Sequence, residues 1–366
     1  MKRVFILGAG FSKQVGLPLA TELTSLILEG TELKEVEDMQ DWLADFKQRL
    51  AALEGKGGDA SGFGINIEEL FDFARYDIEL WRMRQQLEPV DRGAGITAWR
   101  TAEDISTWLR YMEKELVHVI WDAQKKAGLE PIKRFTAELL PDDAVLTFNY
   151  DTLLECALSA QGKPWNHGLN DSSNGGVTVL KMHGSVDWIL LERRPEKELE
   201  KFVKLFSKVD TNVAEHGAQP RKEVEYAWEL WRAKDTRACN AVIEMDKKGL
   251  SNFRYFLACA GLGRYKPLHE LPGSGLTWIT AFKALKEADE IYVIGFSMSP
   301  YDIMARFHFT SVVRARKKPP TRVVVVNPSD SGLGGIMSIV FGGPLKLVEA
   351  PAEDVDWEDV LGQRNR

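Results

Sequence analysis

Five short runs of consecutive apolar residues occur along the chain, and a polar segment follows each of them. They lie near residues 3–7, 144–148, 177–182, 290–294 and 322–326. Short apolar runs without polar alternation are typical of strands that are buried on both faces of a sheet. Helical patterns separate these runs. The order predicts an α/β fold, a doubly wound, Rossmann-like parallel sheet.

Two long blocks interrupt this alternation. Residues 31–140 contain helical patterns and no strand-like run, and Asn66 with Glu69 three positions later indicates a capped helix start. Residues 191–261 are rich in charge and contain Trp228 and Trp231, and we interpret them as a second helical insertion. The predicted organisation is listed here: a core of residues 1–30, 141–190 and 262–350, helical insertions at 31–140 and 191–261, and a C-terminal tail at 351–366.

The first apolar run leads directly into the glycine pair of Gly8-Ala9-Gly10. Glycines at such a turn allow the backbone to approach a pyrophosphate, and a following helix offers unpaired N–H groups. The motif departs from the dehydrogenase G-x-G-x-x-G because Lys13 stands at the third position. We expect a short loop and then a helix from near Pro18 to Gly30. Taken alone, the turn is equally consistent with a purely structural role.

Two further predicted strands end in polar side chains that are candidates for a functional site. Asn149 and Asp151 in "TFNYD" stand two residues apart, so in extended backbone they point the same way. One could orient a ribose or a water while the other holds its neighbour, although Asp151 could instead cap the next helix. His183 in "KMHGS" ends a strand beside a glycine, and its near-neutral pKa range suits a general base. His308, within a helical pattern, is predicted to be structural.

Candidate binding residues also follow the last two predicted strands. Gly295, Phe296 and Ser297 follow the run "IYVI", and Asn327 follows "RVVVV". Ligands of open α/β sheets bind beyond the carboxyl ends of the strands, where the strand order reverses. These residues are therefore candidates for binding phosphate or ribose.

Composition excludes several functional classes. The 366 residues carry a net charge of −7, which argues against a mainly electrostatic nucleic-acid binder. The three cysteines lie far apart without a CxxC pair, which excludes a four-cysteine zinc site and argues against a disulfide framework. No apolar run approaches the length of a membrane span. We therefore expect a soluble, cytoplasmic protein, and neither a resident metal nor a membrane or direct nucleic-acid partner.

The ordered set "GAGFS…GLP", "TFNYD", "MHGS", "GFS" and "VNP" resembles the sirtuin superfamily, in particular the bacterial sirtuin-like proteins of phage defence. The resemblance assigns the NAD-binding loop to Gly8, Ala9, Gly10, Phe11 and Ser12. It assigns the Asn-x-Asp pair to Asn149 and Asp151, and the catalytic histidine to His183. Deacetylating sirtuins carry a four-cysteine zinc ribbon after this histidine, and the present chain has none. The resemblance therefore implies an NAD+ glycohydrolase that consumes NAD+ as its substrate and holds no zinc.

Two other activities stay open at this point. The same pocket could transfer ADP-ribose to a protein or remove an acyl group, or it could sense NAD or ADP-ribose without chemistry. The resemblance also implies a homo-oligomer that depletes NAD+ in abortive anti-phage defence. It further implies a separate regulatory partner, a HerA-type hexameric ATPase in the first place and a short Argonaute in the second.

Overall fold

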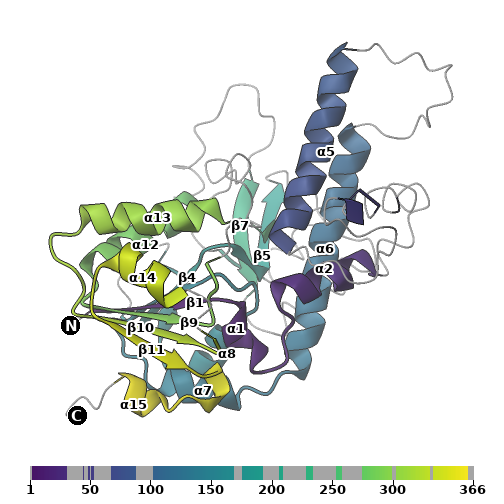
Figure 1. Cartoon of the computed structure of the whole chain (residues 1–366). Coiled ribbons are helices and arrows are strands. Elements are labelled where there is room, and N and C mark those ends of the chain that lie inside the picture. The colour runs from purple at the N-terminus through teal and green to yellow at the C-terminus, as the bar shows by residue number, and fades with distance from the viewer. Residues whose placement is uncertain are drawn as a thin grey trace.

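A computed structural model of the chain contains an all-parallel seven-stranded sheet (Figure 1). It describes residues 2–30, 44, 48–49, 51–52, 67–87, 102–168, 175–192, 206–208, 228–233, 253–257, 274–298, 302–329 and 333–361. The strands of this sheet are β1 (Arg3–Leu7), β2 (Ala144–Thr147), β3 (Trp165–Asn166), β4 (Val177–Lys181), β9 (Glu290–Ile294), β10 (Arg322–Asn327) and β11 (Leu345–Glu349). The α/β fold class and the five predicted strands are confirmed. The edge strands β3 and β11 were not predicted.

The strand order places a switch point at β1. The order across the sheet is β11-β10-β9-β1-β2-β4-β3. From β1 the chain builds outward to β2 and β4, then returns to pair β9 on the other side of β1 and continues to β10 and β11. Apart from the edge strand β3, this is the 3-2-1-4-5-6 order of doubly wound folds. Ile6 in the centre is aligned with Leu146 on one side and Val293 on the other.

Helices cover both faces of the sheet (Figure 1). Successive residues of β1 point to opposite faces, so Phe5 and Leu7 belong to one hydrophobic core and Val4 and Ile6 to the other. The helices over the first core are α2 (Ala20–Leu28), α5 (Ile67–Leu87), α6 (Ala102–Lys126), α7 (Glu130–Ala137), α8 (Leu153–Ala160) and α15 (Trp357–Leu361). Those over the second core are α12 (Ser274–Glu287), α13 (Ile303–Ala315) and α14 (Leu333–Phe341). Among the described helices, none combines the length and apolar character that crossing a bilayer requires.

The described part of the first insertion contains helices and no strand. Its long helices α5 and α6 lie side by side and extend away from the sheet (Figure 1). Trp108, Leu116 and Trp121 of α6 are buried in the same core as Phe5 of the sheet. The insertion is therefore packed onto the sheet through a shared core. The predicted cap at Asn66 lies outside the described residues.

The predicted helical character of residues 191–261 is wrong for every residue of that block that the structure describes. These residues belong to an antiparallel sheet of four strands in the order β6-β7-β5-β8. The strands are β5 (Gly184–Glu192), β6 (Phe206–Lys208), β7 (Trp228–Ala233) and β8 (Phe253–Leu257). The segments "WELWRA" and "FRYFL" are rich in aromatic residues, which favour strands. The charge of the surrounding block concealed this signal.

Candidate functional site

A cavity of about 510 Å³ opens at the carboxyl edge of the parallel sheet, where β1, β2 and β9 end. This volume falls within the range of small-molecule sites. The predicted site residues that line it are Gly8, Ala9, Gly10, Ser12, Asn149, Asp151, His183, Gly295, Phe296, Ser297 and Asn327. The structure therefore brings segments from five strand ends to one cavity.

Phe11 does not line this cavity, and the expected loop after Gly10 is instead a short helix, α1 (Ala9–Lys13). The helical turn directs Phe11 into the core, where its ring centroid lies 5.0 Å from that of Phe135. Only 2% of Phe11 is exposed. The Phe11 side chain thus anchors the turn to the hydrophobic core. The second helix, α2, begins at Ala20, two residues later than predicted.

The glycines of the first turn are required by contact with the turn after β9. A Cβ atom on Gly8 would lie 2.5 Å from the Cα of Phe296, and one on Gly10 would lie 2.9 Å from the Cα of Gly295. Gly295 itself has a φ of +56°, in the left-handed region that favours glycine. The N–H groups of Gly8 and Gly10 donate to the carbonyls of Ile294 and Gly295, at 3.1 and 2.9 Å. These two N–H groups are therefore bonded within the protein and hold the two turns together.

Asn149, Ser12 and Asp151 form one buried hydrogen-bonded network. The Asn149 amide nitrogen donates to the Gly8 carbonyl and to the Ser12 hydroxyl, both at 2.9 Å. Ser12 donates in turn to Asp151 Oδ2 at 2.7 Å. The other Asp151 oxygen accepts the N–H of Leu153 at 3.0 Å, at the start of α8. Asp151 thus links Ser12 to the start of α8, and the network fixes the turn against the end of β2.

A buried ion pair adjoins this network at Asp151. The Lys181 ammonium donates to the Asp151 carbonyl and lies 3.5 Å from a Glu155 oxygen. Burial raises the pKa of the Glu155 carboxyl, and the positive charge of Lys181 opposes this rise. Lys181 therefore holds the backbone of Asp151 in place.

His183 stands in the turn between β4 and β5 and is held by a carboxylate. The next residue, Gly184, has a φ of +80°, in the left-handed region that favours glycine. This conformation lets the chain turn abruptly from β4 of the parallel sheet into β5 of the antiparallel sheet. His183 Nε2 lies 2.9 Å from Asp302 Oδ2, and both side chains are only 3% exposed. Asp302 is itself fixed, because its Oδ1 caps α13 by accepting the Ala305 N–H at 3.1 Å. An ionised Asp302 favours the tautomer of His183 that carries its hydrogen on Nε2.

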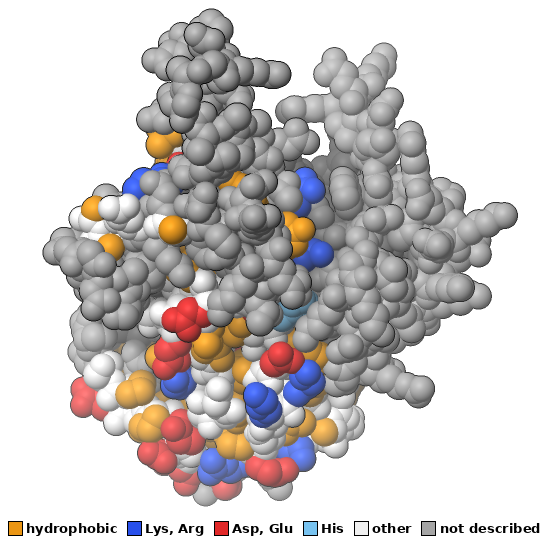
Figure 2. All heavy atoms as spheres, turned by 90° about the vertical axis from the view of Figure 1, so that its right-hand side faces the viewer, with side chains coloured by type: hydrophobic (Ala, Val, Ile, Leu, Met, Phe, Trp, Pro, Cys, Tyr) orange, Lys and Arg blue, Asp and Glu red, His pale blue; other side chains and the backbone are white. Residues whose placement is uncertain are grey.

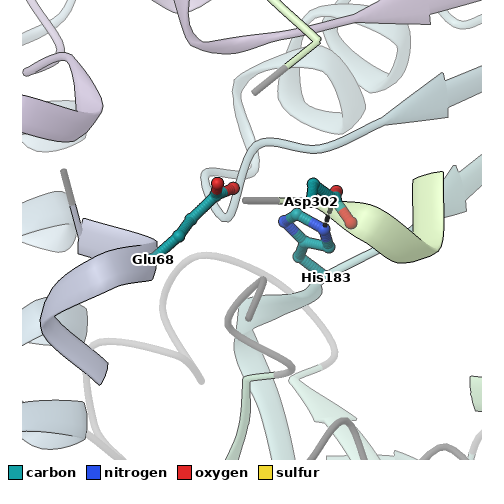
Figure 3. A group of neighbouring side chains, drawn as sticks. All are labelled: Glu68, His183 and Asp302. Atoms are coloured by element: carbon teal, nitrogen blue, oxygen red, sulfur yellow. Dashed lines mark hydrogen bonds and ion pairs between the residues drawn. The ribbon is translucent and has the colours of Figure 1, made fainter. Parts of the chain in front are cut away.

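A third titratable residue reaches the same place from the helical insertion. Glu68, in the first turn of α5, points toward His183 and Asp302 (Figure 3). One potential ligand atom from each of the three lies within 4.8 Å of the others. Such a set suits acid–base chemistry and is also compatible with a divalent cation.

Sequence reasoning assigned no role to Asp302 or Glu68. Asp302 ends the segment "GFSMSPYD", and its position directly before a helix is a cap signal that could have singled it out. Glu68 lies in an insertion, and no local pattern connects it with His183. Only the packing of α5 against α2 and α6 places it there.

The described lining of the cavity is acidic. It includes Glu68, Asp151, Asp302 and Glu353, whereas Lys13 is its one lysine or arginine. Lys13 forms an ion pair with Glu22 at 2.7 Å, and both side chains are nearly half exposed. Elsewhere on the face in Figure 2, the described acidic and basic side chains are interspersed. The cavity thus favours a ligand that carries positive charge near His183.

No family model matches this chain, and no curated protein matches it significantly. The fold therefore defines the class: an α/β protein with a seven-stranded parallel sheet of Rossmann-like order.

Proposed function

We propose that this chain is an NAD+ glycohydrolase that cleaves NAD+ to nicotinamide and ADP-ribose. One observation carries the proposal: a histidine oriented by a buried carboxylate shares the switch-point cavity with the Gly8–Gly10 turn and Asn149. The resemblance of the strand-end motifs to bacterial sirtuin-like proteins supports the choice of NAD+ as the substrate. The absence of a cysteine ribbon from the sequence supports hydrolysis over protein deacylation.

The chemistry matches the groups that the cavity provides. The nicotinamide of NAD+ is a cationic leaving group, so the C1′–N bond breaks without a strong general acid and passes through an oxocarbenium-like state. The bonding electron pair leaves with nicotinamide, and the oxygen of a water then bonds to C1′. His183 accepts a proton from that water or from a ribose hydroxyl, while Asp302 stabilises the resulting imidazolium.

The remaining predicted residues position the substrate. Asn149 is held at its amide nitrogen by Gly8 and Ser12, and we assign it to orient the ribose or the water. The turns of Gly8–Gly10 and Gly295–Ser297, with Asn327, shape the dinucleotide side of the cavity. Lys13 is the cation that we assign to the pyrophosphate, because its surface ion pair with Glu22 is weak and exchangeable.

The proposed biological role follows from the same resemblance. The enzyme would act in the cytoplasm as a homo-oligomer and deplete NAD+ in infected cells. A HerA-type hexameric ATPase, or alternatively a short Argonaute, would control it.

The His183–Asp302 pair favours chemistry over the alternative of a sensor. Transfer of ADP-ribose to a protein would use the same groups with a different acceptor. Isotope-labelled NAD+ separates these reactions, because hydrolysis releases the label as free ADP-ribose and transfer leaves it on protein.

The direct test follows nicotinamide and ADP-ribose released by the purified protein, with and without candidate activators. We expect His183→Ala to lower turnover by about 10²–10⁴-fold, the usual contribution of a general base. His167→Gln is the matched control, because His167 is also buried but does not line the cavity. Absence of turnover under every condition, or full turnover of His183→Ala, would refute the proposal.

A further inference from the structure

The geometry points to Glu68 as a further catalytic residue, whose carboxylate faces the positive charge that develops on the ribose during cleavage. This inference rests on the proposed function. It adds a residue from the helical insertion to a site that otherwise consists of strand ends.

Glu68 is held in place by a well-packed helix. Its neighbours Ile67, Leu70 and Phe71 are at most 3% exposed and belong to the core under the sheet. Ile67 and Glu68 both line the cavity. Because the first turn of α5 is anchored on both sides of Glu68, the carboxylate has a fixed position beside His183 (Figure 3).

The three titratable groups, Glu68, His183 and Asp302, differ in the contacts that they make. Asp302 is committed to the His183 ring through one oxygen and to the α13 cap through the other. Glu68 approaches from a different element, and an oxygen of its carboxylate is shielded from solvent. A carboxylate that is shielded and prepositioned stabilises a nearby cation much more strongly than one in water.

The substrate supplies the matching charge. NAD+ is cationic at the nicotinamide ring, and heterolysis of the C1′–N bond moves positive charge to C1′ and the ring oxygen. Potential ligand atoms of Glu68, His183 and Asp302 lie within 4.8 Å of one another. If His183 approaches the ribose or its attacking water, the proposal places the Glu68 carboxylate on the same part of the substrate. Glu68 acts there as a fixed negative charge and neither gains nor loses a proton.

A divalent cation is the competing occupant of these three residues. An ion on His183 would occupy the lone pair that the base needs, and its charge would repel the cationic nicotinamide. The same acidic lining that could hold a metal is therefore better matched to the substrate's own positive charge. The experiment described next includes metal binding as one of its possible outcomes.

The test compares Glu68→Gln and Glu68→Asp with the wild type and with Glu69→Gln, in kcat and KM for NAD+. Glu69 is the matched control because it occupies the same turn of α5 without lining the cavity. We expect Glu68→Gln to lower kcat by about 10²-fold with little change in KM, and Glu68→Asp to fall between. Thermal melting establishes that each variant is folded.

A second measurement does not depend on turnover. Calorimetric binding in the His183→Ala background compares NAD+ with NADH, whose dihydronicotinamide ring is uncharged. We expect Glu68→Gln to reduce the preference for NAD+ by about threefold or more.

Each outcome decides a different question. Normal kcat in Glu68→Gln, with an unchanged preference for NAD+, overturns the role of Glu68 and leaves the proposed function intact. A wild type that never cleaves NAD+ overturns both. Loss of wild-type activity in EDTA, restored by Mn²⁺ or Zn²⁺, replaces the direct role of Glu68 with that of a metal ligand.

Discussion

The two sides of the cavity use buried polar side chains in different ways. On the turn side, Asn149, Ser12 and Asp151 bond to one another and to backbone groups, so their contacts hold elements together. On the other side, His183 and Asp302 bring together two titratable groups from separate elements, with Glu68 beside them. The comparison indicates that the most recognisable motif, the glycine turn, is chiefly scaffold. In the proposed function, the chemistry is concentrated at His183, Asp302 and Glu68.

The largest expected effect tests the chemical side. Asp302→Asn keeps the α13 cap, because asparagine caps helices as well as aspartate does. It removes the negative charge that fixes the His183 tautomer and stabilises the imidazolium. We expect kcat for NAD+ cleavage to fall on the order of 10³-fold, about 4 kcal/mol in the barrier, with an unchanged melting temperature. Loss of stability in place of activity would show that the pair is structural.

The second effect tests the scaffold side. Gly8→Ala places a Cβ atom 2.5 Å from the Phe296 Cα and 2.6 Å from the Gly295 carbonyl oxygen, and neither backbone atom can move alone. We expect the free energy of unfolding to fall by about 3 kcal/mol in urea titrations. Gly128→Ala is the control, since nothing lies within 4 Å of its added Cβ. Equal stability of both variants would contradict the close packing of the two turns.

Local sequence patterns predicted those parts of the fold that depend on local apolar runs. The buried strands β1, β2, β4, β9 and β10 have such runs because both of their faces are covered. The edge strand β11, "LKLVE", alternates with polar residues and is partly exposed, so it has no continuous apolar run. The antiparallel strands were hidden by the charged segments around them. Pairing between distant segments, which stabilises such strands, leaves little local signal.

The grouping of strand-end residues around one cavity could be predicted for a related reason. Asn149, Asp151 and His183 follow strands that end at one edge, and parallel topology brings such ends together. Phe11 lies in the core and not in the cavity lining, because the helix starts at once and rotates its side chain inward. Asp302 and Glu68 reach the cavity through packing of α13 and α5, which no local pattern encodes.

A third prediction sharpens the comparison with His308, a partly buried histidine that has no catalytic assignment. His308 packs against Trp278 and Phe282, and burial lowers its pKa to about 4. The unfolded chain therefore binds a proton at a higher pH than the folded one, so stability is full above about pH 6.5 and falls as the pH drops toward 4. We expect this histidine to contribute about 2 kcal/mol of stability loss between pH 7 and pH 5. His308→Phe should remove that contribution in urea titrations at both pH values, whereas an identical pH dependence in both proteins would assign it to other groups.

The smallest effect tests whether the turn network is scaffold alone. Ser12→Ala removes the 2.7 Å bond to Asp151 and the acceptor of the Asn149 amide, which leaves buried polar atoms with fewer partners. We expect about 1–2 kcal/mol of lost stability, and a change in kcat below about tenfold because His183 and Asp302 keep their geometry. Ser159→Ala is the control, since its hydroxyl accepts only an exposed bond from Trp165. If Ser12→Ala instead reduced kcat as strongly as Asp302→Asn while the protein stayed equally stable, Ser12 would belong to the chemistry. The division between the two sides of the cavity would then be lost, because the network of Asn149 and Asp151 would act on the substrate as well as on the turn.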